Sequence, residues 1–206
     1  TTRFGSLNVT GGAVSANLAS GTDLAGVSAS SLNLTTAGDI TDSGNINVSG
    51  AATFNSGTNV ITLGDATGEM TAFDSLTITG GAVAITEDGA TTLSSANVGS
   101  LALNSSSTVA LGSVTSTGDL SVTSGIQSGT AITDSGNLAI AGTASFSAGD
   151  NSIITLGDAD GEETNFGSLS LTGGTVTVTE DSATDLAAGS ITSLILNSAG
   201  NITDSG

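Results

Sequence analysis

The sequence contains no cysteine, proline, histidine, lysine, tryptophan or tyrosine, and its only basic residue is Arg3. Without cysteine, the chain has neither a disulfide framework nor thiol chemistry. The absence of proline suits a sheet protein, because every strand keeps its backbone donors. The side chains that most often act as catalytic bases and nucleophiles are also missing, which leaves Asp, Glu, Ser and Thr. We therefore expect no enzyme activity and no catalytic residues.

Positive charge is almost absent, since 19 acidic residues and one basic residue give a net charge of −18. Nucleic acids and anionic lipid surfaces are bound through Lys and Arg, so neither is an expected partner. No apolar run approaches the roughly 18 residues that a transmembrane helix needs. No signal peptide begins the sequence, so we expect any export signal to lie elsewhere.

An internal repeat is the most informative feature that is present. Residues 40–73 read ITDSGNINVSGAATFNSGTNVITLGDATGEMTAF, and residues 132–166 read ITDSGNLAIAGTASFSAGDNSIITLGDADGEETNF. With one gap opposite Asn151, 20 of the 34 aligned positions are identical. This level of identity establishes an internal repeat.

The copies of the repeat are unevenly spaced. The ITDSG segment starts at Ile40, Ile132 and Ile202, so the second interval is much shorter than the first. A second anchor, Phe-(Gly/Asp)-Ser-Leu, occurs at Phe4, Phe73 and Phe166, and here the first interval is the shorter one. The long and short intervals differ by about 23 residues, which predicts a smaller period of that size. The sequence units are then 4–72 with three coils, 73–165 with four coils, and 166–206 as a partial unit.

The composition and the period together predict the fold. The chain has 30 glycines, 37% hydrophobic residues and short runs of alternating apolar and polar residues, such as residues 75–79 and 82–86 on either side of Gly80-Gly81. Propeller blades usually carry an aromatic signature, but aromatic residues make up 2% here. Tandem immunoglobulin-like domains would not tolerate an inserted module of this size. We therefore predict an all-β chain, a parallel β-solenoid of about nine coils of roughly 23 residues, continuous over residues 1–206.

The alternation of apolar residues also predicts the core. Serine and threonine at the intervening positions should face solvent. The residues expected to point inward are Leu76, Ile78, Val83, Ile85, Leu101, Leu103, Val109, Leu111, Leu120, Val122, Leu138, Ile140, Phe146, Ile154 and Leu156.

The pattern Ser-Leu-x-Leu-x-x-x-Gly-x-Ile-x-x-x-Gly occurs at residues 31–44 (SLNLTTAGDITDSG) and 193–206 (SLILNSAGNITDSG). It resembles the repeats of filamentous-haemagglutinin-like giant bacterial surface proteins. The resemblance implies a long right-handed β-helix, secreted or on the bacterial cell surface. It also implies a fibrous adhesin stalk that holds a cell to a surface or to its neighbours, with a surface or glycan receptor.

Two acidic loops, residues 64–69 (GDATGE) and 157–163 (GDADGEE), are the candidate sites. Asp158, Asp160 and Glu162 offer hard oxygen ligands that suit calcium. Leu169, however, occupies the position at which an EF-hand needs a bidentate Glu, and the solenoid calcium motif GGxGxDxUx does not occur. We therefore favour a hydrated acidic loop that keeps a fibre soluble, with no metal ion and no cofactor, and calcium binding is the alternative.

Three functions remain open. The first is a structural fibre or adhesin stalk, which the near-identical and evenly distributed units favour. The second is an ice- or glycan-binding module, since Thr175, Thr177 and Thr179 form an alternating threonine row. The third is a carbohydrate-active solenoid enzyme that uses carboxylates alone, although a polyanionic substrate would meet only one basic residue.

The ends of the sequence suggest a segment of a longer fibre. Thr2 and Phe4 match Thr71 and Phe73, which close a unit, and the chain stops at the third ITDSG copy. We therefore expect the ends to meet further copies of the same repeat, in one polypeptide or in a head-to-tail filament. We also expect like charges to be kept apart along the stack. Asp42 and Asp134 should lie four coils apart, and Asp134 and Asp204 three coils apart.

Overall fold

The computed structural model describes residues 2–206, which form fifteen β-strands in one sheet and contain no helix. This range consequently has no helix that could span a membrane. The strands are β1 (Ser6–Leu18), β2 (Thr22–Thr36), β3 (Ile40–Asp42), β4 (Ile46–Asn55), β5 (Ile61–Leu63), β6 (Thr71–Glu87), β7 (Thr91–Ser105), β8 (Val109–Ser116), β9 (Leu120–Ser124), β10 (Ser128–Asp134), β11 (Leu138–Ser147), β12 (Asn151–Leu156), β13 (Thr164–Glu180), β14 (Thr184–Ser198) and β15 (Ile202–Asp204).

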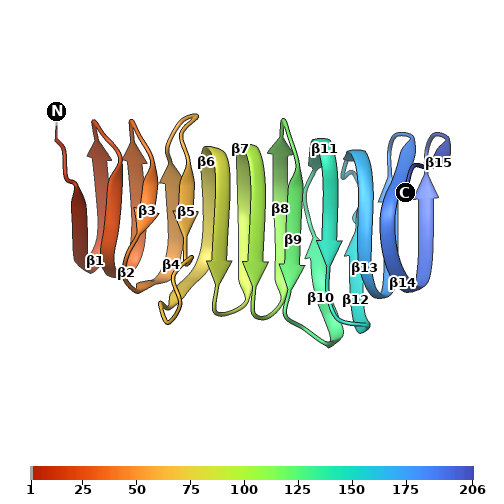
Figure 1. Cartoon of the computed structure of the whole chain (residues 1–206), viewed down its shortest axis with the longest axis horizontal. Helices are drawn as coiled ribbons and strands as arrows, with labels where there is room; N and C mark the ends of the chain where they lie inside the picture. Colours follow the sequence, from red (N-terminus) through yellow and green to blue (C-terminus); the bar gives the residue numbers. More distant parts are fainter. Residues whose placement is uncertain (1) are drawn as a thin grey trace.

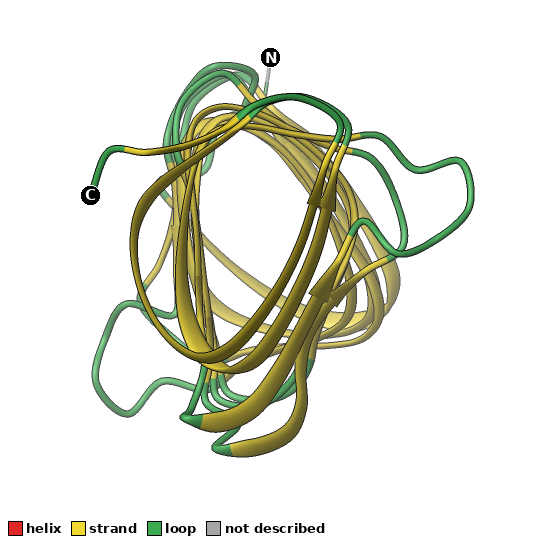
Figure 2. Ribbon diagram, turned by 90° about the vertical axis from the view of Figure 1, so that its right-hand side faces the viewer, coloured by secondary structure: helices red, strands yellow, loops and turns green. Residues whose placement is uncertain are grey.

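The chain winds into a single coiled tube. The strands follow one another along the long axis from the N-terminal end to the C-terminal end (Figure 1), and the view along this axis shows the coils superimposed around one interior (Figure 2). Every strand pairing is parallel, and a paired residue has its partner a full coil later, as Val83 does in Leu101. The predicted all-β parallel solenoid is confirmed.

The coils are shorter and more numerous than the sequence period predicts. They lie about 19 residues apart and make about ten turns, where we expected nine longer coils. Their lengths also vary, since Leu76 pairs with Leu93 across a short coil. Leu138, in contrast, pairs with Thr164 across a coil that contains the second acidic loop. The strand sections stay in register while the loops differ in length. An average over units that contain long loops therefore overestimates the number of residues in the basic coil.

Successive copies of the repeat lie on opposite sides of the tube. One row of stacked residues runs through Ile40, Ile61, Val83, Leu101, Leu120, Ala144, Leu169, Leu186 and Asp204. Ile132 is not in this row, because it comes half a coil after Leu120 and stacks between Val109 and Ile154. The step from Asp42 to Asp134 is therefore four and a half coils, and the step from Asp134 to Asp204 is three and a half coils. These aspartates are not immediate neighbours, as predicted, but each step is half a coil longer than predicted.

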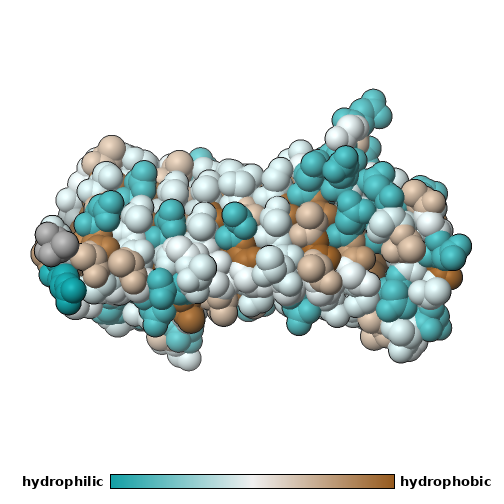
Figure 3. Space-filling model, turned by 90° about the horizontal axis from the view of Figure 1, so that it is seen from above, coloured by the Kyte–Doolittle hydropathy of each residue, from teal (hydrophilic) through white to brown (hydrophobic). Residues whose placement is uncertain are grey.

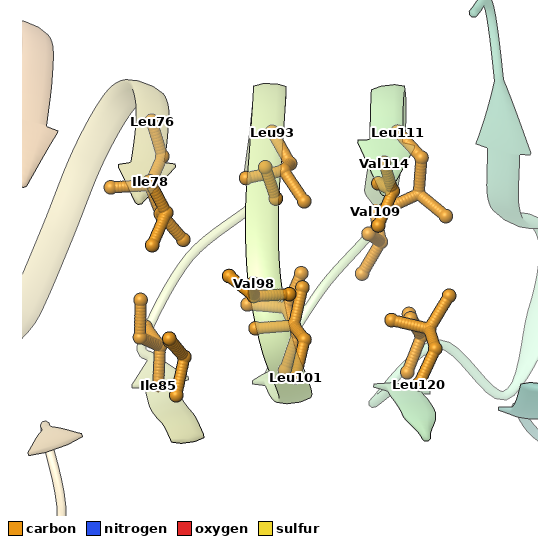
Figure 4. Close-up of a cluster of buried hydrophobic side chains, with 14 of the residues drawn as sticks. Leu76, Ile78, Ile85, Leu93, Val98, Leu101, Val109, Leu111, Val114 and Leu120 are labelled. Atoms are coloured by element: carbon orange, nitrogen blue, oxygen red, sulfur yellow. The ribbon is translucent and has the colours of Figure 1, made fainter. Parts of the chain in front are cut away.

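The interior is apolar, as the alternation of residues predicts. All fifteen of the residues expected to point inward are buried, with Leu103, Leu111 and Leu120 at 0% exposure. Figure 4 shows part of this core, in which Leu76, Leu93 and Leu111 come from successive coils. Stacking gives each coil an apolar partner on both sides, which a single coil could not provide.

Serine and threonine do not all face solvent. A subset points inward near the turns. Some of these hydroxyls have a local partner, as Ser56 Oγ does by donating to the Asn59 carbonyl oxygen at 2.8 Å, whereas the hydroxyls of Thr22, Thr71, Thr91 and Thr164 have none. The buried members are Thr22, Thr36, Ser56, Thr71, Thr91, Ser105, Ser116, Ser124, Ser152, Thr164 and Thr184. These residues continue the inward alternation, as Ser56 does two positions after Phe54. The serines and threonines at the intervening positions of residues 2–206 are not buried, as predicted.

The strands are longer than the short runs that the sequence suggests. Gly80 and Gly81 lie within β6 and do not end it, so residues 75–79 and 82–86 belong to one strand that bends around the tube. A Cβ atom at Gly81 would lie 2.2 Å from the Thr58 carbonyl oxygen. Glycine is thus required at this bend because of close backbone approach and does not indicate a strand end.

Candidate functional site

The two acidic loops are the longest connections of the tube. One follows β5 and leads into β6, and the other follows β12 and leads into β13. Figure 2 shows two long loops that project from opposite sides of the tube, as the half-coil offset requires. In Figure 3 the loop between β12 and β13 forms a hydrophilic projection. The repeat thus presents the same loop on both sides of the tube.

The aspartate of each ITDSG segment holds the start of an acidic loop. Asp42, the last residue of β3, accepts hydrogen bonds from the backbone N–H of Gly64 at 3.0 and 3.1 Å. Asp134, the last residue of β10, accepts the equivalent bonds from the N–H of Gly157 at 2.9 and 3.2 Å. Both aspartates are 8% exposed. ITDSG and the acidic loop therefore recur together because one coil binds the loop of the next.

The asparagine after ITDSG holds the other end of the loop. The Asn45 side-chain oxygen accepts a hydrogen bond from the Met70 N–H at 2.9 Å. In the second copy Asn137 accepts one from the Glu163 N–H at 3.1 Å. Side chains of the preceding coil therefore hold each loop at both ends, and this fixes where the loop carries its carboxylates.

The first glycine of each loop is required by geometry. Gly64 and Gly157 have φ angles of +70° and +67°, in the left-handed region that favours glycine. A Cβ atom at Gly64 would lie 2.1 Å from the Thr86 carbonyl oxygen. This turn directs the glycine N–H to the buried aspartate of the preceding coil.

Each loop brings three carboxylates together. Oxygen atoms of Asp42, Asp65 and Glu69 lie within 4.8 Å of one another. Burial, together with the nearby charges of Glu69 and Asp65, raises the pKa of Asp42 to about 6, although the Gly64 N–H opposes the shift. This cluster combines a buried carboxylate with two carboxylates from the loop.

The second loop repeats the arrangement. Oxygen atoms of Asp134, Asp158 and Glu162 lie within 4.8 Å of one another. Burial is again the main cause that raises the pKa of Asp134, here to about 7, with the charges of Glu162 and Asp158 adding to it. We call the first set the Asp42 cluster and the second the Asp134 cluster.

The structure changes the set of residues predicted as calcium ligands. Asp158 and Glu162 come together, but their third partner is Asp134, whereas Asp160 is exposed and lies outside the cluster. Spacing along one loop could not reveal Asp134, because it belongs to the preceding coil. The signal that was available is the joint recurrence of ITDSG and the acidic loop in both copies.

The threonine row of the ice-binding alternative lies on the outside of β13. Thr175 is exposed, and Thr177 and Thr179 are partly exposed. The row does not extend regularly along the tube, since Thr177 stacks between Thr155 and Ile195. The threonine row is thus confined to β13, and the neighbouring coils carry apolar residues at some of the corresponding positions.

Comparison with protein families gives one match. The model of a family described as "Repeats of unknown function (DUF5649)" matches residues 11–77 and residues 98–172. Each matched segment contains one ITDSGN sequence and the acidic loop that follows it. No curated protein and no solved structure matched the chain. The chain belongs to the family of DUF5649 repeats.

Proposed function

We propose that this chain is a structural segment of an extracellular fibre or cell-surface stalk, built by stacking solenoid coils end to end. The observation that carries the proposal is the regular stacking of the coils. About ten turns share one apolar interior, and each inward row runs through successive coils, as Leu76, Leu93 and Leu111 do.

Stacking of this kind can be continued by a further coil of the same repeat. Within the tube each coil buries the apolar row of its neighbour and pairs with its backbone groups. Because successive coils present the same kind of backbone edge and the same inward apolar row, the partner that fits a coil of this tube is a coil of another copy of the repeat.

Two further features support a stalk. Coils about 4.8 Å apart give the ten turns a length of about 48 Å. The resemblance of residues 31–44 to filamentous-haemagglutinin-like repeats supports a bacterial surface location and an adhesive role. Immunogold labelling of intact producing cells tests the location, and labelling confined to the cell interior would contradict it.

End-to-end assembly is tested with variants of the inward-facing end residues. We expect the wild-type chain to associate at high concentration, as seen by light scattering after size-exclusion chromatography, and to form filaments in electron micrographs. Leu194→Asp and Ile202→Asp should abolish this association by placing a charge in the covered interface. Val60→Asp is the matched control, because Val60 is 42% exposed between β4 and β5, away from both terminal coils. A wild-type chain that stays monomeric at every concentration would contradict the proposal.

A further inference from the structure

In each acidic loop, the glutamate of the cluster carries an oxygen atom with no hydrogen-bond partner. The atom is Oε2 in Glu69 and Oε1 in Glu162, and both atoms are buried. The other oxygen of Glu162 accepts a hydrogen bond from the Ala159 N–H at 3.0 Å. A buried carboxylate oxygen without a partner is unfavourable. Because the same unpaired atom occurs in two loops on opposite sides of the tube, it is a property of the repeat.

The chain supplies no counterion for these clusters. Its single basic residue, Arg3, precedes β1, whereas the clusters lie where β5 meets β6 and where β12 meets β13. Carboxylate oxygens within 4.8 Å of one another repel when ionised. A cation held between them would neutralise the repulsion and give the unpaired glutamate oxygen a ligand.

The donor set selects the kind of cation. Each cluster offers three carboxylates and no nitrogen or sulfur, which favours a hard cation. Ca²⁺ accepts six to eight oxygen ligands in a flexible geometry, whereas Mg²⁺ demands a near-ideal octahedron and gives up its water reluctantly. We propose that Asp42, Asp65 and Glu69 bind one Ca²⁺ ion. Asp134, Asp158 and Glu162 bind a second on the opposite side of the tube.

Calorimetric titration of the whole chain with CaCl2, after treatment with EDTA, tests this proposal. We expect two Ca²⁺ ions per chain and a higher unfolding temperature with CaCl2 than with EDTA, followed by circular dichroism. Glu69→Gln and Glu162→Gln should each leave one ion per chain, and the double variant should leave none. The substitutions keep the side-chain shape and lie outside the strands, and the circular dichroism spectrum checks that each variant folds.

Asp160→Asn is the matched control, because Asp160 is an exposed acidic residue of the same loop outside the cluster. This variant should still bind two ions. If Asp160→Asn bound only one ion, the proposed ligand set would be overturned. Tighter binding of MgCl2 than of CaCl2 would overturn the choice of cation. Absence of binding at about 10 mM CaCl2, beyond the range of extracellular calcium modules, would overturn the whole proposal. The titration reports on single chains, so its outcome is separate from that of end-to-end assembly.

Discussion

Phe54 and Phe73 pack edge to face in the core, with their ring centroids 5.6 Å apart and their planes at 74°. The second copy of the repeat contains the same pair, Phe146 and Phe166, at 5.8 Å and 62°. The two pairs join consecutive coils at corresponding positions of the repeat. In each copy the first phenylalanine lies in the sequence between the ITDSG segment and the acidic loop. Four of the five phenylalanines of the chain take part in these pairs.

Truncation of this pair should weaken the tube strongly. Phe54 is 0% exposed, so Phe54→Ala should lower the free energy of unfolding by about 3 to 5 kcal/mol. Combined with Phe73→Ala, the loss should be smaller than the sum of the single losses, by about 0.5 to 1.5 kcal/mol. Denaturant unfolding of the four proteins measures this coupling. Strictly additive losses would show that the ring geometry contributes nothing beyond burial.

Replacement of the first loop glycine should be more damaging than replacement of a later one. Gly68 has a φ of +90° and open space around its Cα, so Gly68→Ala should cost about 1 to 2 kcal/mol from backbone strain alone. Gly64→Ala adds a Cβ atom 2.1 Å from the Thr86 carbonyl oxygen and should cost more. Thermal unfolding followed by circular dichroism compares the two. Equal losses would mean that the loop can move away from β6 and that its position is not fixed.

Stability should fall as the pH rises, in part through Glu87. Burial, together with the nearby charge of Asp88, raises the folded-state pKa of Glu87 above the reference value of 4.5. The nearby Thr91 hydroxyl and the hydrogen bond that the Phe73 N–H donates to Glu87 at 2.9 Å oppose this shift. The folded protein therefore binds the proton more tightly than the unfolded chain does. The stability contribution is fully present below about pH 4.5 and is lost as the pH rises through the folded-state pKa.

Glu87→Gln removes this titration. Denaturant midpoints measured with EDTA from about pH 4 to about pH 8 should fall less steeply for the variant than for the wild type. Glu163→Gln removes an exposed carboxylate and controls for the change in net charge. Parallel curves for Glu87→Gln and the wild type would show that burial of Glu87 does not affect its protonation.

Removal of one complete coil should be tolerated. Thr91 pairs with Val109, so deletion of residues 91–108 places Leu111 where Leu93 stacks on Leu76 of β6 and keeps every inward position inward. Deletion of residues 91–99 removes about half a coil and brings Leu101 to the outward position of Thr92. Circular dichroism should show a folded sheet for the first variant and loss of it for the second. A folded half-coil deletion would contradict the observed register.

The strand pattern and the core were predictable because alternation along a strand reports directly on which side chains face inward. Leu101 and Leu103 are one example, and the structure buries both. The coil length was harder to predict, because the interval from Ile40 to Ile132 reports a sum over coils and loops of unequal length. No pattern in the sequence reveals that this sum ends in half a coil, since the opposite faces of the tube have the same apolar alternation.

The candidate site was predictable only in part. Asp158 and Glu162 share a loop, and their spacing indicated that they could act together. Asp134 joins them because parallel stacking places the end of β10 beside the turn after β12, and that neighbour depends on the coil length. Asp160 was included on spacing alone, and the loop turns it towards solvent.

The half-coil step between repeats also determines which sides of the tube carry the acidic loops. Whole-coil repeats would place residues 64–69 and 157–163 on the same side and leave the opposite side without such a loop. The observed step instead gives two opposite sides of one tube the same kind of loop, each with a buried aspartate at its base.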